Sequence, residues 1–213
     1  MLEVDVDNLF DLGQDLASRI VKYMRAKKYF VAIGSQRYNI VYLEGANEDG
    51  TPNADQIDGW NDRRIVIEIP KSTPIIKGNW AATTEPGITY TVNPLNKNGA
   101  FRIDLKQFKA WQVGIHKDHE ALVQRANVSG RRDGNKDGFR TGDLPVNGLF
   151  KINQHGAEDT INVGPWSAGC LVGKRHRDFM KLIKQDQRYL LSRNYLFMSA
   201  VIGADDLAKN FPA

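Results

Sequence analysis

The only cysteine of the chain, Cys170, lies in a sequence setting that favours chemistry over packing. It ends the segment Ser167-Ala168-Gly169-Cys170, and His155 precedes it by 15 residues (170 − 155). A thiol attacks as its thiolate, and a histidine within hydrogen-bond reach can remove the proton. The glycine before the cysteine permits a tight turn and a close approach of substrate to the backbone. The pattern predicts a nucleophile at Cys170 with His155 as its base.

Two plainer interpretations stay open at this point. A lone cysteine is commonly a small buried hydrophobe, and a lone histidine is commonly a hydrogen-bonded structural residue. If the thiol does react, N–H groups near Gly169 and Cys170 would point at the developing oxyanion. The spacing of the two residues alone does not decide between these interpretations.

Three elements around the cysteine resemble the active-site signature of the L,D-transpeptidase catalytic-domain family. They are His155-Gly156, Gly164 and Ser167-Ala168-Gly169-Cys170, where the family has a histidine–glycine pair followed by Ser/Thr-His-Gly-Cys. A phage-associated branch of such proteins is more similar still, because it carries the WSAGC element that ends here at Cys170. The likeness covers about residues 78 to 185.

The resemblance implies a role for each matching residue. Cys170 would be the nucleophile that accepts the acyl group, and His155 would be its general base. Gly169 and Cys170 would donate hydrogen bonds to the oxyanion, and Ser167 would brace the loop. The family's histidine before the Gly-Cys pair is Ala168 here, so that side chain's contact with substrate is absent.

A second departure concerns substrate binding. The arginine or asparagine expected two residues after the cysteine is Val172, and Arg175 is a candidate to replace it. His116 and Trp166 are further candidates to line the substrate cleft. The alternatives for these two are a surface histidine and a half-buried aromatic residue.

The implied function is thiol-dependent acyl transfer on the peptide stems of peptidoglycan. Water as the acceptor gives hydrolysis, as in a bacteriophage endolysin or an L,D-carboxypeptidase or endopeptidase, and we expect this outcome. An amine as the acceptor gives the cross-linking reaction of an L,D-transpeptidase. A third possibility is a non-catalytic module of the same fold that binds the cell wall or belongs to a virion. The sequence leaves the cleaved bond, the acceptor and the oligomeric state open.

The segment RDGNKDGFRTGD contains a pattern typical of calcium loops. Asp133, Asn135 and Asp137 alternate before a glycine, as the oxygen ligands of such a loop do. The closing carboxylate should stand at Leu144, whereas Asp143 lies one place early. A polar turn without metal is the alternative. We expect at most a structural calcium ion and no cofactor for the chemistry; zinc is disfavoured, because the histidines lack a typical ligand spacing.

Composition limits the partners of the chain. A formal net charge of +4 is mild, and no recognised helix or aromatic-basic platform supports binding to nucleic acid. No run of about 18 apolar residues is present, so we expect no membrane span. The acidic N-terminus is unlike a secretory signal, which predicts synthesis in the cytoplasm and action at the bacterial wall after release.

The apolar spacing predicts a mainly β, α+β fold, sandwich-like or barrel-like, with a helix near each end. Residues 1–28 would form an N-terminal helical extension, capped at Asp7 or Asn8, and residues 29–213 the catalytic domain. Strands are expected at 29–33 and 38–43 as a hairpin, at 64–69, and at several short segments that include 88–92. A helix at 174–187 would follow the cysteine, and a polar tail would end the chain.

Overall fold

Eight strands form a closed ring in the computed structural model, which describes residues 10–213. Their order around the ring is β1-β11-β5-β6-β9-β10-β3-β2. The β1–β11 and β9–β10 pairs are parallel, and the other neighbours are antiparallel. The strands of the ring are β1 (Gly34–Glu44), β2 (Asp62–Ile69), β3 (Ile75–Thr83), β5 (Gln107–His116), β6 (His119–Gln124), β9 (Gln154–Gly156), β10 (Leu171–Gly173) and β11 (Phe197–Gly203).

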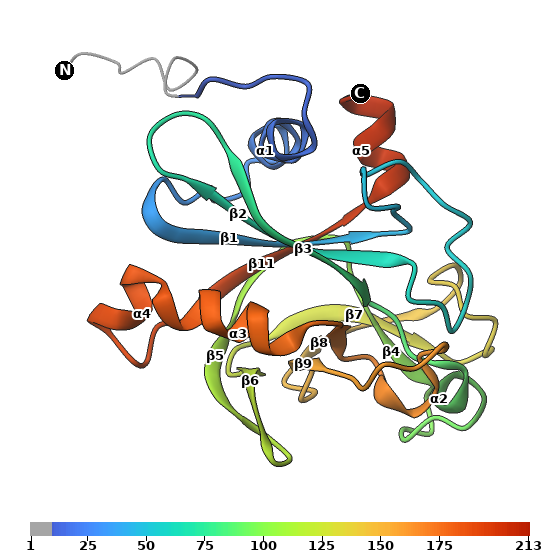
Figure 1. Ribbon diagram of the computed structural model, residues 1–213. Helices are drawn as coiled ribbons and strands as arrows, with labels where there is room; N and C mark the ends of the chain where they lie inside the picture. Colours follow the sequence, from blue (N-terminus) through green and yellow to red (C-terminus); the bar gives the residue numbers. More distant parts are fainter. Residues whose placement is uncertain (1–9) are drawn as a thin grey trace.

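A smaller antiparallel sheet and a few short helices complete the fold (Figure 1). The sheet has the order β4-β7-β8 and consists of β4 (Ala100–Ile103), β7 (Val128–Asp133) and β8 (Leu144–Gly148). The helices are α1 (Leu16–Ala26), α2 (Ile88–Val92), α3 (His176–Gln185), α4 (Gln187–Leu191) and α5 (Ala204–Asn210), with a 3-10 turn η2 (Gly164–Trp166).

The interior of the ring is filled by one hydrophobic cluster. Side chains alternate between the two faces of a strand, so Ile40 and Tyr42 of β1 point inward while Val41 and Leu43 point outward. The inward cluster includes Trp111, whose Nε1–H donates to the carbonyl of Ile152 at 2.7 Å. Burial of apolar surface on this scale is the main source of folding free energy.

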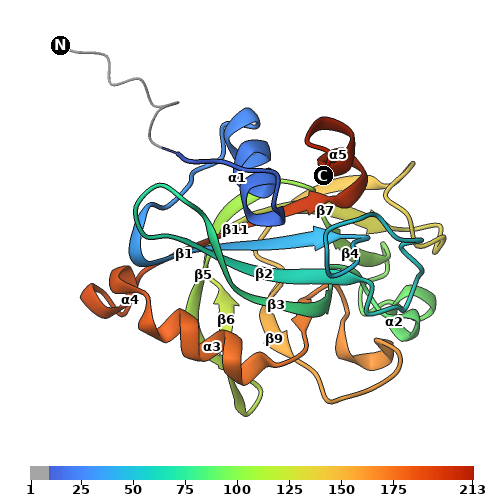
Figure 2. The same ribbon diagram turned by 45° about the horizontal axis from the view of Figure 1, so that its top comes forward.

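Helices α1 and α5 cover the outward face of β1, β2 and β11 (Figures 1 and 2). The amphipathic stripe of α1 places Ile20, Val21 and Met24 in this second cluster. The side chain of Asp15 caps the helix by accepting the N–H of Ser18 at 3.1 Å. None of the helices in the described part of the chain is both long and apolar enough to span a bilayer.

The predicted fold class is confirmed: the structure is mainly β, with a helix near the N-terminus and another after the cysteine. The expected caps Asp7 and Asn8 lie outside the described residues. The hairpin prediction is wrong, because residues 29–33 form no strand. In this segment the N–H of Ala32 donates to the side chain of Asn39, and the N–H of Phe30 donates to the side chain of Gln107.

Residues 88–92 were also expected to form a strand and instead form helix α2. The N–H groups of Tyr90 and Thr91 donate to the carbonyl of Gly87, so a local turn outweighs the β propensity of the segment. The expected polar tail contains helix α5, whose Leu207 is buried against α1 and the sheet. A local turn therefore explains the first error, and tertiary packing of Leu207 explains the second.

The packing of α3 gives a direct test of the fold. Phe179 is 0% exposed in the inward cluster, so Phe179→Ala should lower the free energy of unfolding by about 3–5 kcal/mol. Leu191, at the end of α4, is 85% exposed, and Leu191→Ala should change the free energy of unfolding by less than about 0.5 kcal/mol. Urea denaturation measures both values, and equal losses would contradict this packing.

Candidate functional site

The parallel pairing of β9 with β10 brings the chain segments that carry the two predicted catalytic residues side by side. Val172 lies opposite His155 in the register, and the N–H of Leu171 donates to the carbonyl of Asn153 at 3.0 Å. Cys170 directly precedes β10, two residues before Val172. The Sγ of Cys170 contacts the backbone of Asn153 and Lys151, and no contact joins Cys170 to His155 among the described residues.

The protonation state of His155 follows from its hydrogen bond. Nδ1 lies 2.8 Å from the carbonyl oxygen of Gly156, which can only accept, so Nδ1 carries the proton. The other nitrogen, Nε2, then holds a lone pair that can take a proton. The Gly156 carbonyl thus orients the imidazole as a carboxylate does in a serine-protease triad.

Cys170 is half-buried and rests as a thiol. Its Sγ accepts the N–H of Asn153 at 3.4 Å and donates to the carbonyl of Lys151 at 3.5 Å. Burial raises the pKa of the thiol to about 11, although the hydrogen bond from Asn153 opposes the shift. The sulfur therefore keeps its proton at neutral pH.

His155 rests as a neutral imidazole. Burial lowers the pKa of His155 to about 4, and the nearby cation of Arg64 acts in the same direction. A neutral thiol and a neutral base fit a mechanism in which the proton moves as the sulfur attacks, rather than one that starts from a thiolate–imidazolium ion pair.

The loop that precedes Cys170 is held in its conformation by hydrogen bonds of the Ser167 side chain. Ser167 is fully buried; its Oγ donates to the carbonyl of Cys170 at 2.8 Å and accepts the N–H of Gly169 at 3.1 Å. The amide of Gly169 is thus engaged within the loop rather than directed at substrate. Gly169 has a φ of +119°, and a Cβ there would overlap the carbonyl oxygen of Phe101. Both facts explain the glycine before Cys170.

Of the residues expected to bind substrate, His116 lies in this group. Its ring stacks on His155 with centroids 4.6 Å apart, and its Nδ1 accepts from the Asn153 amide at 2.9 Å. Trp166 is half-buried in η2. Arg175 is exposed at the start of α3 and pairs with Asp178, and no contact joins it to Cys170 or His155 among the described residues.

Sequence reasoning missed the buried arginine that supports this site. Arg64 of β2 is 0% exposed, and its guanidinium donates to the carbonyl of His155 at 3.4 Å and to that of Lys174 at 2.7 Å. The guanidinium lies 4.2 Å from the ring centroid of Phe179 and 3.2 Å from Nδ1 of His176. The local sequence gave little signal, because β2 also contains the charged residues Asp62, Arg63 and Glu68.

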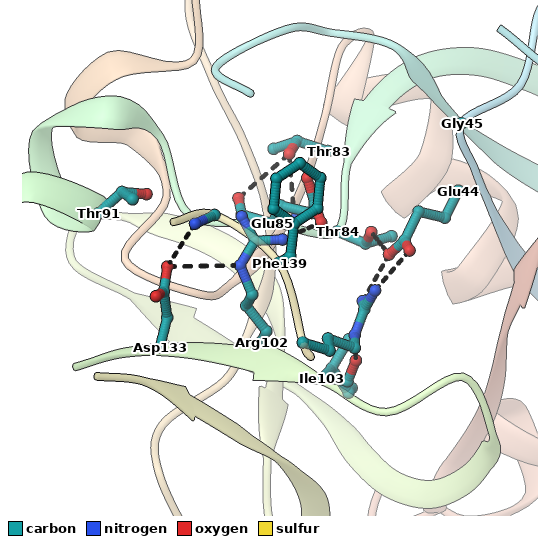
Figure 3. Close-up of polar contacts among 12 residues, drawn as sticks. Glu44, Gly45, Thr83, Thr84, Glu85, Thr91, Arg102, Ile103, Asp133 and Phe139 are labelled. Carbon is teal, nitrogen blue, oxygen red and sulfur yellow. Dashed lines mark hydrogen bonds and ion pairs between the residues drawn. The ribbon is translucent and has the colours of Figure 1, made fainter. Parts of the chain in front are cut away.

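A second polar centre contains an acidic triad. Carboxylate oxygens of Glu44, Asp55 and Glu85 lie within 4.8 Å of one another, close enough to hold a metal ion. Figure 3 shows Glu44 and Glu85 with their polar contacts. Two arginines already bind this triad: Arg140 pairs with Glu44 through both of its terminal nitrogens at 2.6 Å, and Arg102 pairs with Glu85. These guanidiniums disfavour a cation between the same carboxylates.

The residues of the predicted calcium loop, Asp133, Asn135 and Asp137, lie at the end of β7 and in the loop to β8. They lie on different elements from Cys170 and His155. Comparison with family models, with curated proteins and with solved structures found no match to this chain.

Thiol reactivity tests the neutral resting state. A pKa of about 11, against an ordinary 9.0, means that Cys170 in the folded protein should react with iodoacetamide about 100-fold more slowly at pH 7.5 than in the unfolded chain. The rate should rise about tenfold for each pH unit between 7 and 9.5, because the thiolate fraction does. Mass spectrometry measures the rate; a plateau below pH 7 would reveal an ion pair instead.

Substitution of two glycines with positive φ distinguishes the stability cost of backbone strain from the cost of steric overlap. Gly142 has a φ of +84° with open space around it, so Gly142→Ala should lower the free energy of unfolding by about 1 kcal/mol. Gly169→Ala adds the collision with the Phe101 carbonyl and should lower it by about 2–5 kcal/mol. Chemical denaturation compares them, and similar losses would contradict the close approach at Gly169.

Proposed function

We propose that this chain is a cysteine-dependent acyl-transfer enzyme that acts on the peptide stems of peptidoglycan. The observation that carries the proposal is the tautomer of His155, whose Nδ1–H is bound by Gly156 so that Nε2 is available as a base. The β9–β10 register pairs Val172 with His155, so the segment that follows Cys170 runs beside the strand that carries this imidazole. The substrate class comes from the resemblance of the His-Gly and Ser-Ala-Gly-Cys segments to the L,D-transpeptidase signature.

The reaction follows from these positions. Sγ of Cys170 attacks a carbonyl carbon of the stem peptide while its proton passes to Nε2 of His155. The tetrahedral intermediate collapses as the C–N bond breaks, and His155 returns the proton to the leaving amine. Water then attacks the thioester, His155 takes its proton, and the released sulfur is protonated again. An amine in place of water gives a cross-link.

Oxyanion stabilisation and substrate contact involve further groups. Because Ser167 engages the amide of Gly169, we assign the oxyanion hydrogen bond from this loop to the N–H of Cys170 itself. His116 accepts from Asn153 at Nδ1, so its neutral ring presents Nε2–H as a donor for a substrate carbonyl. Burial lowers the pKa of His116, which keeps this ring neutral as well.

One observation favours the second candidate, a wall-binding module without turnover. The thiol donates to the carbonyl of Lys151, and its pKa is raised rather than lowered. A module of this kind would bind peptidoglycan without cleaving it. The two functions differ in their products and in the reactivity of Cys170.

Purified peptidoglycan fragments with mass spectrometry of the products test the proposal. Cys170→Ala should reduce product formation by about 10³-fold or more, and His155→Gln by about 10²–10⁴-fold. The thermal midpoint of Cys170→Ala should stay within about 2 °C of the unchanged protein, because one half-buried sulfur atom is removed. His119→Gln, at an exposed position of β6, is the matched histidine control and should keep full activity.

Hydrolysed stems would indicate hydrolysis, and new cross-links would indicate transfer to an amine. Full activity of Cys170→Ala would place the nucleophile elsewhere. Binding without products by the unchanged protein, together with no labelling of Cys170 by an activated-ester probe, would support the binding module instead.

A further inference from the structure

The ring of His176, the first residue of α3, lies between two groups that fix its tautomer. Its Nε2 lies 2.8 Å from the carbonyl oxygen of Glu120, which can only accept a hydrogen bond. Its Nδ1 lies 3.2 Å from Nη1 of Arg64, and a guanidinium can only donate. Both contacts therefore require the proton on Nε2 and a lone pair on Nδ1.

His176 is thus an acceptor for a buried cation. Arg64 is 0% exposed, and a buried charge is costly unless its donors find acceptors. The same nitrogen, Nη1, also donates to the carbonyl of His155 at 3.4 Å, so it bridges the ring of His176 and the strand of the candidate base. Burial lowers the pKa of His176 to about 3, and the charge of Arg64 acts in the same direction, so the ring is neutral near pH 7.

A second contact joins His176 to the surroundings of the candidate base. A Cβ on Gly156 would lie 2.6 Å from Cβ of His176, so the backbone of Gly156 packs directly against this side chain. The carbonyl of Gly156 is the group that binds Nδ1 of His155. His176 therefore touches both groups that hold His155, the guanidinium at its carbonyl and the glycine at its ring.

We propose that His176 is a positioning residue for His155, which acts through the guanidinium of Arg64 and the backbone of Gly156. The role of His155 as a base rests on the proposed function, whereas the tautomers of the two rings do not. Loss of the acceptor at His176 leaves a donor of the buried guanidinium unpaired, so Arg64 and the strand that it binds shift. His155 can then take the other tautomer, whose Nε2–H cannot accept a proton.

Nuclear magnetic resonance of the full chain, isotopically labelled at the histidine ring nitrogens, reads these tautomers directly. At neutral pH the proton should lie on Nε2 of His176 and on Nδ1 of His155. His176→Leu keeps the Cβ contact but removes the acceptor, and it should give a mixture of His155 tautomers. His176→Asn, whose Oδ1 can accept from Arg64, should restore the single tautomer. Arg177→Leu, at an exposed position of α3, is the matched control and should change neither ring.

Activity on peptidoglycan fragments gives an independent readout. His176→Leu should lower kcat about 10–100-fold with KM nearly unchanged, because a displaced base slows the chemical step rather than binding. His176→Asn should recover most of this loss. A role in stability alone would lower the thermal midpoint of His176→Leu without changing the His155 tautomer.

A proton on Nδ1 of His176 in the unchanged protein would overturn the proposal, and this measurement does not depend on the folding of any variant. A single, unaltered His155 tautomer in a folded His176→Leu protein would also overturn it. The expected tautomers together with an absence of peptidoglycan products would contradict the proposed function and still support the positioning of His155 by His176.

Discussion

The short parallel pairing of β9 with β10 is the constraint on which the candidate site depends. Each strand has three residues, and their register sets His155 opposite Val172, two residues after Cys170. A shift of one residue would move the imidazole to the opposite face, where Gln154 now binds Ser199 and lies near Tyr42. Such a short pair has little stability of its own, so its register is held by its surroundings.

The buried guanidinium of Arg64 supplies much of that support. It binds the carbonyls of His155, at the middle of β9, and Lys174, just beyond β10, so one side chain from β2 fixes both strands. The same positive charge opposes protonation of His155 and His176, and burial of each ring acts in the same direction. Burial of the imidazole is thus the main reason that His155 stays neutral, and the charge of Arg64 adds to it.

The sequence predicts best what depends on neighbouring residues. Helical spacing identified α1 and α3, the strands expected at 38–43 and 64–69 lie in β1 and β2, and the Ser-Ala-Gly-Cys segment marked the loop that Ser167 closes on itself. Prediction from the sequence failed where contacts between residues of different elements decide the local structure. Backbone N–H groups in residues 29–33 donate to the side chains of Asn39 and Gln107. Arg64 donates to the carbonyl of His155, which lies 91 residues further along the chain. No local pattern encodes a contact of that kind.

Strand β4 connects the two polar regions of the molecule. The carbonyl of Phe101 meets Gly169, the residue before the thiol, and leaves no room for a side chain there. The next residue, Arg102, pairs with Glu85 and lies beside Asp133 at the start of the acidic loop. Neighbouring residues of β4 thus contact both the loop that precedes Cys170 and the carboxylate of Asp133.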